Sequence, residues 1–367
     1  MKPMTYAGSG VDYDALDPFK RRAQLAGRST ADVLRRLGVS EVEMSRGESA
    51  YLIETPDSFL AHVEEGLGTK NLVADAMYRL VPERSFYDHI AQDTVAMIVN
   101  DMITLGALPL AVAMHLGAGS SDWFKDDRRA GDLVDGWRRA CERARCAWGG
   151  GETPTLSGVV EAATVVLAGS AIGLVKPKDR LIRANIQAGD AIVVFESAGI
   201  HANGLTLARA IAERAPNGYL TPLADGRPYG EALLDPTHIY VGVIEDCLNR
   251  GVDVHYAVNV TGHGWRKLMR SPEPFAYVID TVPTPQPVFD FIQAIGNVDD
   301  AEAYGNFNMG AGFAIYVPEK DVPTVLDVAK SFPFGASRAG HIEKSATRRV
   351  VIGPKGLEYS ADTLRVR

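Results

Sequence analysis

The sequence predicts a mixed α/β protein, with mixed sheets, built from two domains. Short apolar runs alternate with amphipathic segments of helical period along the chain. At 367 residues the chain exceeds the length at which one hydrophobic core usually keeps growing. A charged, turn-rich stretch at residues 174–190 separates two series of such elements. We therefore expect a first domain over residues 1–178 and a second over residues 179–367.

The elements of the first half follow in a clear order. A strand is predicted at residues 57–63, followed by a glycine loop and a helix at residues 71–80. A longer helix fits residues 88–109, with an apolar stripe in its centre and with Gly106 and Pro109 marking its end. A third helix, a glycine cluster and one or two buried strands are then expected at residues 131–147, 148–158 and 159–175.

The second half repeats this alternation. A buried strand at residues 190–195 leads through a loop into an amphipathic helix at residues 205–214. A strand at residues 252–258 is followed by a second glycine turn. The remaining predicted elements are helices at residues 265–270, 287–296 and 322–332 and strands at residues 313–317, 338–344 and 348–352.

Composition excludes several classes of function. The formal net charge of −8 argues against a surface that tracks nucleic acid or an anionic membrane. The longest apolar stretch, residues 159–175, is interrupted by Glu161 and two glycines and does not resemble a membrane helix. Three cysteines without paired spacing suit a reducing compartment. We expect a cytoplasmic protein that acts on a small molecule.

Four loops combine glycines with residues that carry chemistry: EEGLGTK at 64–70, GGGETP at 149–154, SAGIHANG at 197–204 and VTGHGW at 260–265. Glycines at strand–helix junctions let backbone N–H groups approach a phosphate, and a following helix N-terminus adds favourable partial charge. A single loop of this kind is as often a simple turn. Four loops containing Lys, Glu, Asn, Thr or His favour phosphate handling, although none matches the usual nucleotide-binding signature.

The helix predicted at residues 88–109 adds carboxylates. Asp93 and Asn100 are seven residues apart, so both project to one side of the helix about 10 Å apart, with Asp101 on the flank. A polar stripe is usually a solvated face. Here Glu65, Glu152 and Lys70 provide further charged groups, and a polyphosphate brings Mg²⁺, which a few carboxylates bind.

The order of these motifs resembles the aminoimidazole ribonucleotide synthetase family, also called phosphoribosylformylglycinamidine cyclo-ligase. The similar segments run in order from YAGSGVDYDA at residues 6–15 to NFNMGAGF at residues 306–313 and include all four glycine loops. The resemblance implies the two-domain fold of that family and a homodimer that pairs through its N-terminal domains. It also implies an ATP- and Mg²⁺-dependent reaction in which the formyl oxygen of formylglycinamidine ribonucleotide is phosphorylated and an amidine nitrogen closes the imidazole ring.

The resemblance assigns roles to individual residues. Lys70 and His201, which match the family pattern, are catalytic candidates, and His263, which departs from that pattern, is a third because its ring can exchange protons at neutral pH. The expected substrate contacts are Asn203, Gly204, Thr261 and Gly262. The expected ATP-binding residues, among which Glu65, Asp93 and Glu152 are the candidate Mg²⁺ ligands, are Glu65, Gly66, Gly68, Thr69, Asp93, Asn100, Asp101, Gly150, Gly151, Glu152 and Thr153.

Departures from the family pattern concern the substrate side. Glu65 stands where the family usually has Asp, and His263 replaces the middle glycine of a T-G-G-G turn. Met114 stands where an aspartate is common, and Asn259 where histidine is frequent. His263 is open to two interpretations, a proton-exchanging or phosphate-contacting group and a histidine that merely tolerates a tight turn.

Two alternatives to the cyclo-ligase remain open. One is a paralogue that uses ATP to activate another carbonyl or amide. The other is a non-catalytic dimer that binds nucleotides as a regulator. Selenophosphate synthetases need a reactive Cys or selenocysteine near the start, and hydrogenase-maturation dehydratases need a C-terminal cysteine. The first cysteine here is Cys141 and the chain ends TLRVR, so neither fits.

Overall fold

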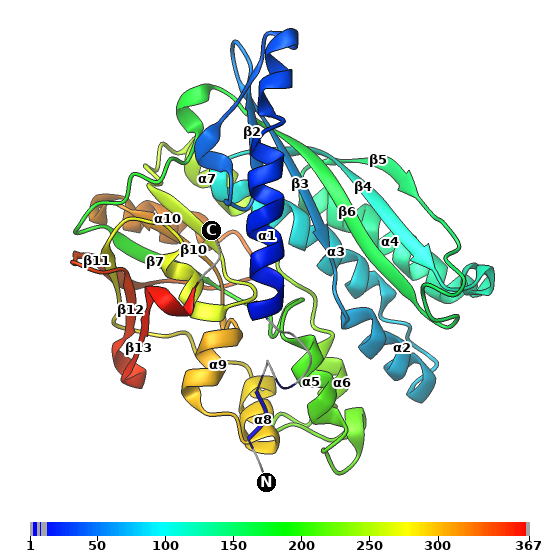
Figure 1. Cartoon of the computed structure of the whole chain (residues 1–367). Coiled ribbons are helices and arrows are strands. Elements are labelled where there is room, and N and C mark those ends of the chain that lie inside the picture. The colour runs from blue at the N-terminus through cyan, green and yellow to red at the C-terminus, as the bar shows by residue number, and fades with distance from the viewer. Residues whose placement is uncertain (1–2, 6–7, 9–12, 365–367) are drawn as a thin grey trace.

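Two β-sheets, each built from one half of the chain, organise the structure, a computed structural model in which residues 3–5, 8 and 13–364 are described (Figure 1). Residues 6, 7 and 9–12 of the N-terminal segment quoted above lie outside the described residues. The first sheet uses residues 40–175 and the second uses residues 191–360. The domain boundary between residues 178 and 179 stays a prediction.

The first sheet has six strands in the order β1-β2-β3-β6-β4-β5. All neighbours pair antiparallel except β4 and β5, which are parallel. The strands are β1 (Ser40–Glu41), β2 (Tyr51–Glu54), β3 (Phe59–Gly66), β4 (Leu108–Ala118), β5 (Ala147–Glu152) and β6 (Val165–Val175).

The second sheet has seven strands in the order β13-β12-β9-β11-β7-β10-β8. β12 and β9 pair parallel, and the other neighbours are antiparallel. The central strands β7 and β10 are buried on both faces, as their continuous apolar sequences require. The strands are β7 (Ala191–Glu196), β8 (Tyr256–Asn259), β9 (Phe275–Ile279), β10 (Ala311–Val317), β11 (Ala336–Lys344), β12 (Arg349–Ile352) and β13 (Leu357–Ser360).

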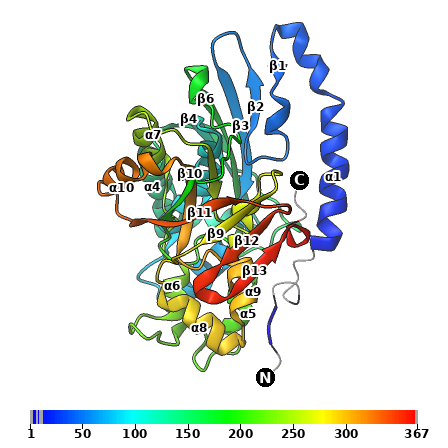
Figure 2. The ribbon, with the colours of Figure 1, turned by 90° about the vertical axis from the view of Figure 1, so that its left-hand side faces the viewer.

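Helices cover one face of the first sheet and surround the second. In the first half, α2 (Lys70–Leu80), α3 (Tyr87–Met102) and α4 (Asp127–Arg143) lie on that side, and α1 (Tyr13–Arg28) stands apart from it (Figure 2). In the second half they are α5 (Leu205–Ala212), α6 (Tyr229–Leu233), α7 (Val241–Asn249), α8 (Pro287–Gly296), α9 (Asp300–Asn306) and α10 (Val322–Ala329). None of the helices in the described ranges has the length and apolarity needed to cross a bilayer.

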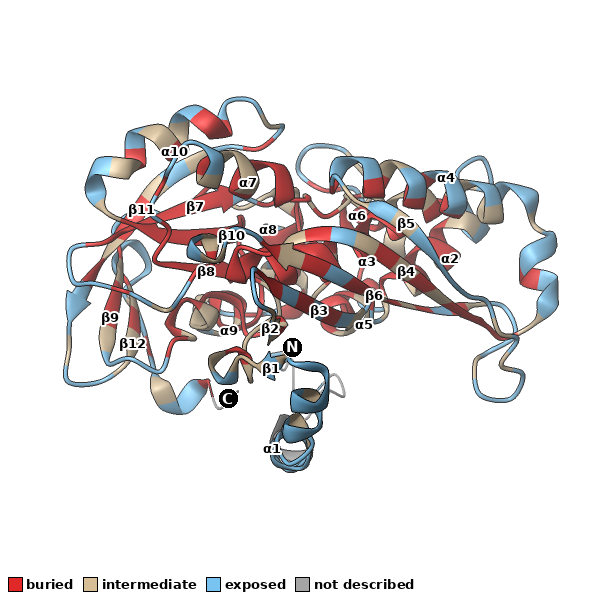
Figure 3. Ribbon diagram, turned by 90° about the horizontal axis from the view of Figure 1, so that it is seen from above, coloured by how far each residue is buried: buried red, intermediate tan, exposed pale blue. Residues whose placement is uncertain are grey.

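Helix α3 lies at the centre of the molecule. It packs against β3, β4 and β6 of the first sheet and against β8 of the second, so it is buried almost all round. Helix α1 differs: it stands along one side of the body, with Phe19 and Leu25 about 72% and 71% exposed (Figures 2 and 3). Figure 3 shows the contrast between this helix and the buried strands.

Two predictions for the first half are wrong in detail. The central helix ends at Met102, followed by a 3-10 turn to Leu105, and residues 108–118 form β4 rather than a helix end. Gly106 closes the turn with a positive φ of 75°. The glycine cluster was expected as a loop, but Gly149–Glu152 belong to the edge strand β5. In the second half, the helix predicted at residues 265–270 is a 3-10 helix, Gly264–Met269.

Candidate active site

A cavity of about 290 Å³ between the two domains gathers residues from both, and we call it the polar pocket. Its lining comes from α1, from β3 and α3 of the first domain, and from the two glycine turns of the second domain. The sequence-predicted residues among its lining are Glu65, Asp101, Asn203, Thr261, Gly262 and His263. The other lining residues are Lys20, Glu48, Ser49, Met97, Lys267, Arg270 and Leu364.

Two carboxylates form one side of the polar pocket. Alternate residues of β3 face the helices, and this alternation brings Glu65 to the side of α3 that carries Asp101. Burial first, and then the charge of Asp101, raise the pKa of Glu65 to about 7. Asn259 donates a hydrogen bond of 2.7 Å to Asp101. Two repelling carboxylates in a shared cavity are suited to a divalent cation that substrate oxygens and water complete.

A basic wall faces the carboxylates. Lys267 donates to the hydroxyl of Thr261, and burial lowers the pKa of this lysine to about 8. Arg270 donates to Ser49 and to the Gly47 carbonyl, each at 2.7 Å, and pairs with the Glu48 carboxylate at 3.5 Å, which fixes its guanidinium at the edge of the cavity. Cations on one side and carboxylates on the other let the pocket hold an anionic group next to a metal ion.

The turn at residues 261–264 is tightly constrained. His263 has a φ of 71°, and a Cβ at Gly264 would overlap backbone atoms of residues 304–307. Burial, followed by the nearby Arg266 and Lys267, lowers the pKa of His263 to about 3. At neutral pH the ring is therefore uncharged, so it does not serve as a cation for a phosphate. The two interpretations of its function, proton exchange and tolerance of the turn, both stay predictions.

The loop before α5 contributes Asn203 to the lining of the polar pocket, whereas His201 of the same loop does not line it. Asn203 lines the polar pocket, and its amide nitrogen lies 3.7 Å from the Met97 sulfur. His201 has a φ of 60° and accepts a 3.1 Å hydrogen bond at Nε2 from the Ala198 N–H. Complete burial lowers the pKa of His201 well below its usual value, so the ring is neutral. His201 thus supports the loop rather than lining the pocket.

Gly204, the last residue of this loop, provides a test of the local geometry. Its φ is 80°, and a Cβ added there would overlap the Phe307 ring. We expect Gly204→Ala to lower the free energy of unfolding by about 2–4 kcal/mol, because backbone strain adds to overpacking. Gly226→Ala is the matched control, since Gly226 has a φ of 84° with open space around its Cβ position. Equal losses in urea denaturation of both variants would contradict the overlap.

Lys70 and Asp93 lie outside the polar pocket, at the interface between the domains. The Lys70 ammonium is 2.8 Å from an Asp93 carboxylate oxygen, and both side chains are fully buried. Lys70 also donates to the Asp235 carbonyl at 2.8 Å, and Asp93 accepts from the Thr237 N–H at 2.8 Å and from its hydroxyl. Lys70 and the polar side of α3 therefore form hydrogen bonds with residues 235–237 of the second domain.

Asn100 adds further hydrogen bonds between the domains. Its amide donates to the His238 carbonyl at 2.8 Å and accepts from the Tyr240 N–H at 2.9 Å. Its hydrogen bonds in the structure go to the backbone of the second domain, which gives the predicted ATP-contacting residue a structural task.

The glycine loop before α2 borders a different cavity, of about 550 Å³, which we call the glycine-loop cavity. Gly68, with a φ of 78°, and Thr69 line it together with Arg79 of α2 and Arg209 of α5. Gly66 is the last residue of β3. Of the predicted ATP-binding residues, Gly68 and Thr69 therefore line this cavity, Glu65 and Asp101 line the polar pocket, and the others line neither.

Gly150, Gly151, Glu152 and Thr153 lie at the far edge of the sheet. Cross-strand pairing aligns Gly66, Ala168, His115 and Glu152 in one row. Three strand spacings separate the ends of this row, about 14 Å. Glu65, Asp93 and Glu152 are therefore not brought together, and the described part of the chain contains no cluster of three or more His, Cys, Asp or Glu suited to a metal.

Sequence reasoning missed the basic wall. Lys267 and Arg270 were part of a segment interpreted only as a helix, and Lys20 was not singled out. Lys267 and Arg270 are three residues apart and directly follow a glycine turn. This spacing was the available signal, because it places both cations on one side of a helical segment.

Comparison with known proteins supplies a family. A model described as "AIR synthase related protein, N-terminal domain" matches residues 47–175, and one described as "AIR synthase related protein, C-terminal domain" matches residues 187–353. A phosphoribosylformylglycinamidine cyclo-ligase of Methanocaldococcus jannaschii is 32% identical over 361 residues, covering 97% of this chain and 98% of the relative. Its namesake from Methanothermobacter thermautotrophicus is 34% identical over 352 residues, covering 94% and 97%. A solved structure of AaThiL with AMPPCP and TMP has a similar fold, with a TM-score of 0.56 at 14% identity over 86% of this chain and 90% of its own.

Proposed function

Since the chain belongs to the AIR synthase related protein family, we propose that it is a phosphoribosylformylglycinamidine cyclo-ligase of purine biosynthesis. In this reaction ATP is consumed, formylglycinamidine ribonucleotide becomes aminoimidazole ribonucleotide, and ADP and phosphate are released. The observation that carries the proposal is the polar pocket, where carboxylates of the first domain face cations and a glycine turn of the second. We place the enzyme in the cytoplasm, in keeping with its three free cysteines.

The residues of the polar pocket fit distinct tasks. Lys267, Arg270 and the turn at Thr261 would hold the phosphate of the ribonucleotide, because charged and backbone donors converge there. Asn203 would orient the amide-type groups of the substrate. Glu65 and Asp101 would hold Mg²⁺, which when bound supplies positive charge against the phosphate oxygens of ATP.

The roles of Lys70, His201, Asp93 and Glu152 stay predictions. Lys70 and Asp93, both in the first domain, bond each other at the domain interface, and Glu152 lies three strands from Gly66. A role for Glu152 would require an extended triphosphate or a second subunit.

The direct test is turnover by the purified full-length protein with Mg²⁺ and ATP. ADP release that depends on formylglycinamidine ribonucleotide and yields an imidazole product supports the proposal. ADP release only with another carbonyl or amide acceptor would indicate a paralogue. Tight nucleotide binding without turnover would indicate a regulator.

The basic wall gives a more specific prediction. Lys267→Met is expected to raise the KM for the ribonucleotide about 10- to 100-fold while the KM for ATP changes little, because one charge-assisted contact to phosphate is lost. For the parent, kcat/KM should fall as pH rises through about 8, where Lys267 loses its proton. Lys330→Met, on an exposed surface, is the control. An unchanged KM in steady-state kinetics would contradict the assignment.

We also propose a homodimer that pairs through the first sheet. The face of this sheet opposite α3 carries Leu60, Val166 and Ile172, which are 40%, 49% and 53% exposed. Exposed apolar side chains that gather on one sheet face indicate a contact surface.

We expect the parent to sediment as a dimer and Ile172→Asp to sediment as a monomer in analytical ultracentrifugation. Val134→Asp is the control, because Val134 is equally exposed but lies on α4 on the other side of the sheet. Dimers of the Ile172 variant as stable as those of the parent would contradict this interface.

A further inference from the structure

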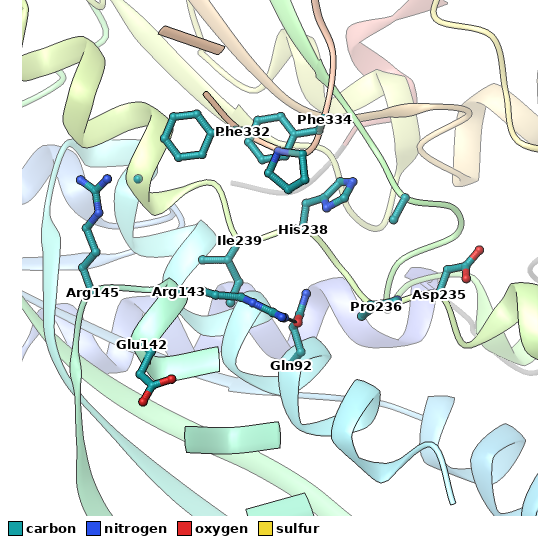
Figure 4. A pocket seen from close by; sticks show the side chains of 13 residues that line it. Gln92, Glu142, Arg143, Arg145, Asp235, Pro236, His238, Ile239, Phe332 and Phe334 are labelled. Carbon is teal, nitrogen blue, oxygen red and sulfur yellow. Dashed lines mark hydrogen bonds between the residues drawn. The ribbon is translucent and has the colours of Figure 1, made fainter. Parts of the chain in front are cut away.

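A second cavity between the domains, of about 780 Å³, shares no lining residue with the polar pocket, and we call it the aromatic cavity (Figure 4). It lies beside Gln92 of α3, whereas the polar pocket lies beside Asp101. Nine residues correspond to a half-turn beyond two full turns, so the two cavities open on opposite sides of α3. Its volume is within the range of small-molecule sites, which runs from about 300 to 1,000 Å³.

The second domain supplies an aromatic wall. Phe332 and Phe334, in the loop after α10, are stacked with ring centroids 5.6 Å apart at 19°. The ring of His238 lies 5.1 Å from that of Phe334, and Ile239 and Pro333 also line the cavity. Figure 4 shows the phenylalanine rings on one side of the cavity and the arginines on another. Such a wall offers a flat surface on which a planar ring can pack.

Among the charged side chains that line the cavity, Arg143 differs from the others in its partners. Arg145 bonds Glu245 and Asp246, Glu142 bonds Arg138, and Asp235 bonds Arg227. Each of these charges is therefore compensated. Arg143 donates only to the neutral amide of Gln92, and in the described part of the chain no carboxylate lies within ion-pair distance of it.

Additional features favour an anion near Arg143. Gly242, in the first turn of the nine-residue helix α7, lines the cavity, so the positive end of the α7 dipole faces it. A Cβ at Gly242 would lie 2.7 Å from the Phe332 ring and 3.2 Å from Arg145, so this position leaves room only for glycine between the aromatic and the basic walls.

We propose that the aromatic cavity is a ligand site for a planar aromatic phosphate of nucleoside monophosphate size, with its ring against Phe332 and Phe334 and its phosphate on Arg143. This site is separate from the polar pocket and from the cyclo-ligase reaction. The residues that carry it come from both domains, so the ligand bridges them.

The site is connected to the buried ion pair. Arg143 holds the Gln92 oxygen, and the Gln92 amide donates to the Thr237 carbonyl at 2.8 Å. Thr237 in turn donates to Asp93, the partner of Lys70. A phosphate bound to Arg143 would compete with the Gln92 oxygen for the guanidinium. Gln92 would then lose one of the contacts that orient its amide toward Thr237. The ligand would therefore lie next to a side chain that contacts the support of the domain interface.

The test uses the full-length protein saturated with Mg²⁺ and AMPPCP, so that any site for ATP is already filled. AMP is titrated by isothermal calorimetry, and phenyl phosphate is used as a minimal second probe. We expect one AMP per chain, with an affinity at least tenfold lower in Arg143→Gln and in Phe332→Leu. Both side chains are at least partly exposed, so these variants should keep the fold.

Arg128→Gln is the matched control, because Arg128 lies on the same helix fifteen residues away, with its guanidinium on the Glu83 carbonyl. AMP binding should be unchanged in this variant. Absence of saturable binding by both probes would overturn the proposal. Binding that neither Arg143→Gln nor Phe332→Leu weakens would overturn it equally, because the ligand would then lie elsewhere.

Discussion

Replacing Lys70 with methionine is expected to lower the free energy of unfolding by about 3–5 kcal/mol, because the Asp93 charge would be left buried without its partner. Removing the charge of Asp93 as well should recover much of this loss. The double variant Lys70→Met/Asp93→Asn keeps an oxygen that can accept from the Thr237 N–H and hydroxyl. Urea denaturation of the parent, the two single variants and the double variant measures the coupling between the two side chains.

The same variants separate the structural task of Lys70 from its predicted catalytic role. If the lysine also handles phosphate, the folded double variant should stay inactive although its stability is restored. Lys125→Met is the control for loss of a lysine, since Lys125 is exposed and its partner Asp122 is exposed as well. A single Lys70 variant that loses less than about 1 kcal/mol would contradict the importance of the buried pair. A double variant with parental turnover would contradict the catalytic role.

Glu65→Gln is expected to reduce turnover about 100-fold or more while leaving the metal-free protein at least as stable as the parent. Loss of a Mg²⁺-binding carboxylate removes several kcal/mol of stabilisation from the reacting phosphate. The substitution should not lower the stability of the metal-free protein, although it lowers turnover. Burial raises the pKa of Glu65 from 4.5 to about 7, so the folded protein resists ionisation of this group, whereas the unfolded chain does not.

This difference makes the prediction dependent on pH. Near pH 4 the side chain is neutral in both states, and the parent and the variant should have similar unfolding temperatures. As pH rises through the window from 4.5 to about 7, the parent loses stability that the amide variant keeps. Thermal unfolding in EDTA measures the difference in unfolding temperature between the parent and Glu65→Gln. This difference should reach its full size by about pH 8.

Glu83→Gln is the control, because Glu83 is exposed in the turn after α2 and does not line the polar pocket. It should change neither turnover nor the pH profile of stability. A Glu65 variant that turns over ATP at the parental rate would contradict the metal site in the polar pocket.

Sequence patterns predicted the mixed α/β class, the family and those elements with a clear period. The helix predicted at residues 71–80 is α2, and the helix predicted at residues 287–296 has the bounds of α8. Strand β4 was missed because apolar and small residues occupy both of its faces, so no alternation is visible. Pro109 was interpreted as the end of a helix, although it lies within this strand.

The residues of the candidate site could be predicted from the sequence only where they lie within a single glycine loop. The turns containing Asn203 and Thr261 were identified from their glycines and do line the polar pocket. The partner of Lys70 was not, because Asp93 lies 23 residues away and their contact depends on how α2 and α3 pack. The same limit applies to Glu65 and Asp101, whose proximity requires β3 and α3 to be placed together.

The contacts by which the first domain holds residues 235–240 are made mostly to main-chain atoms. Lys70, Gln92 and Asn100 donate to the carbonyls of residues 235, 237 and 238, each at 2.8 Å. A backbone offers these carbonyls whatever side chains it carries. These three contacts therefore do not depend on the side chains at residues 235, 237 and 238, whereas each is lost when its donor, Lys70, Gln92 or Asn100, is replaced, so this part of the joint between the domains is encoded in the first domain.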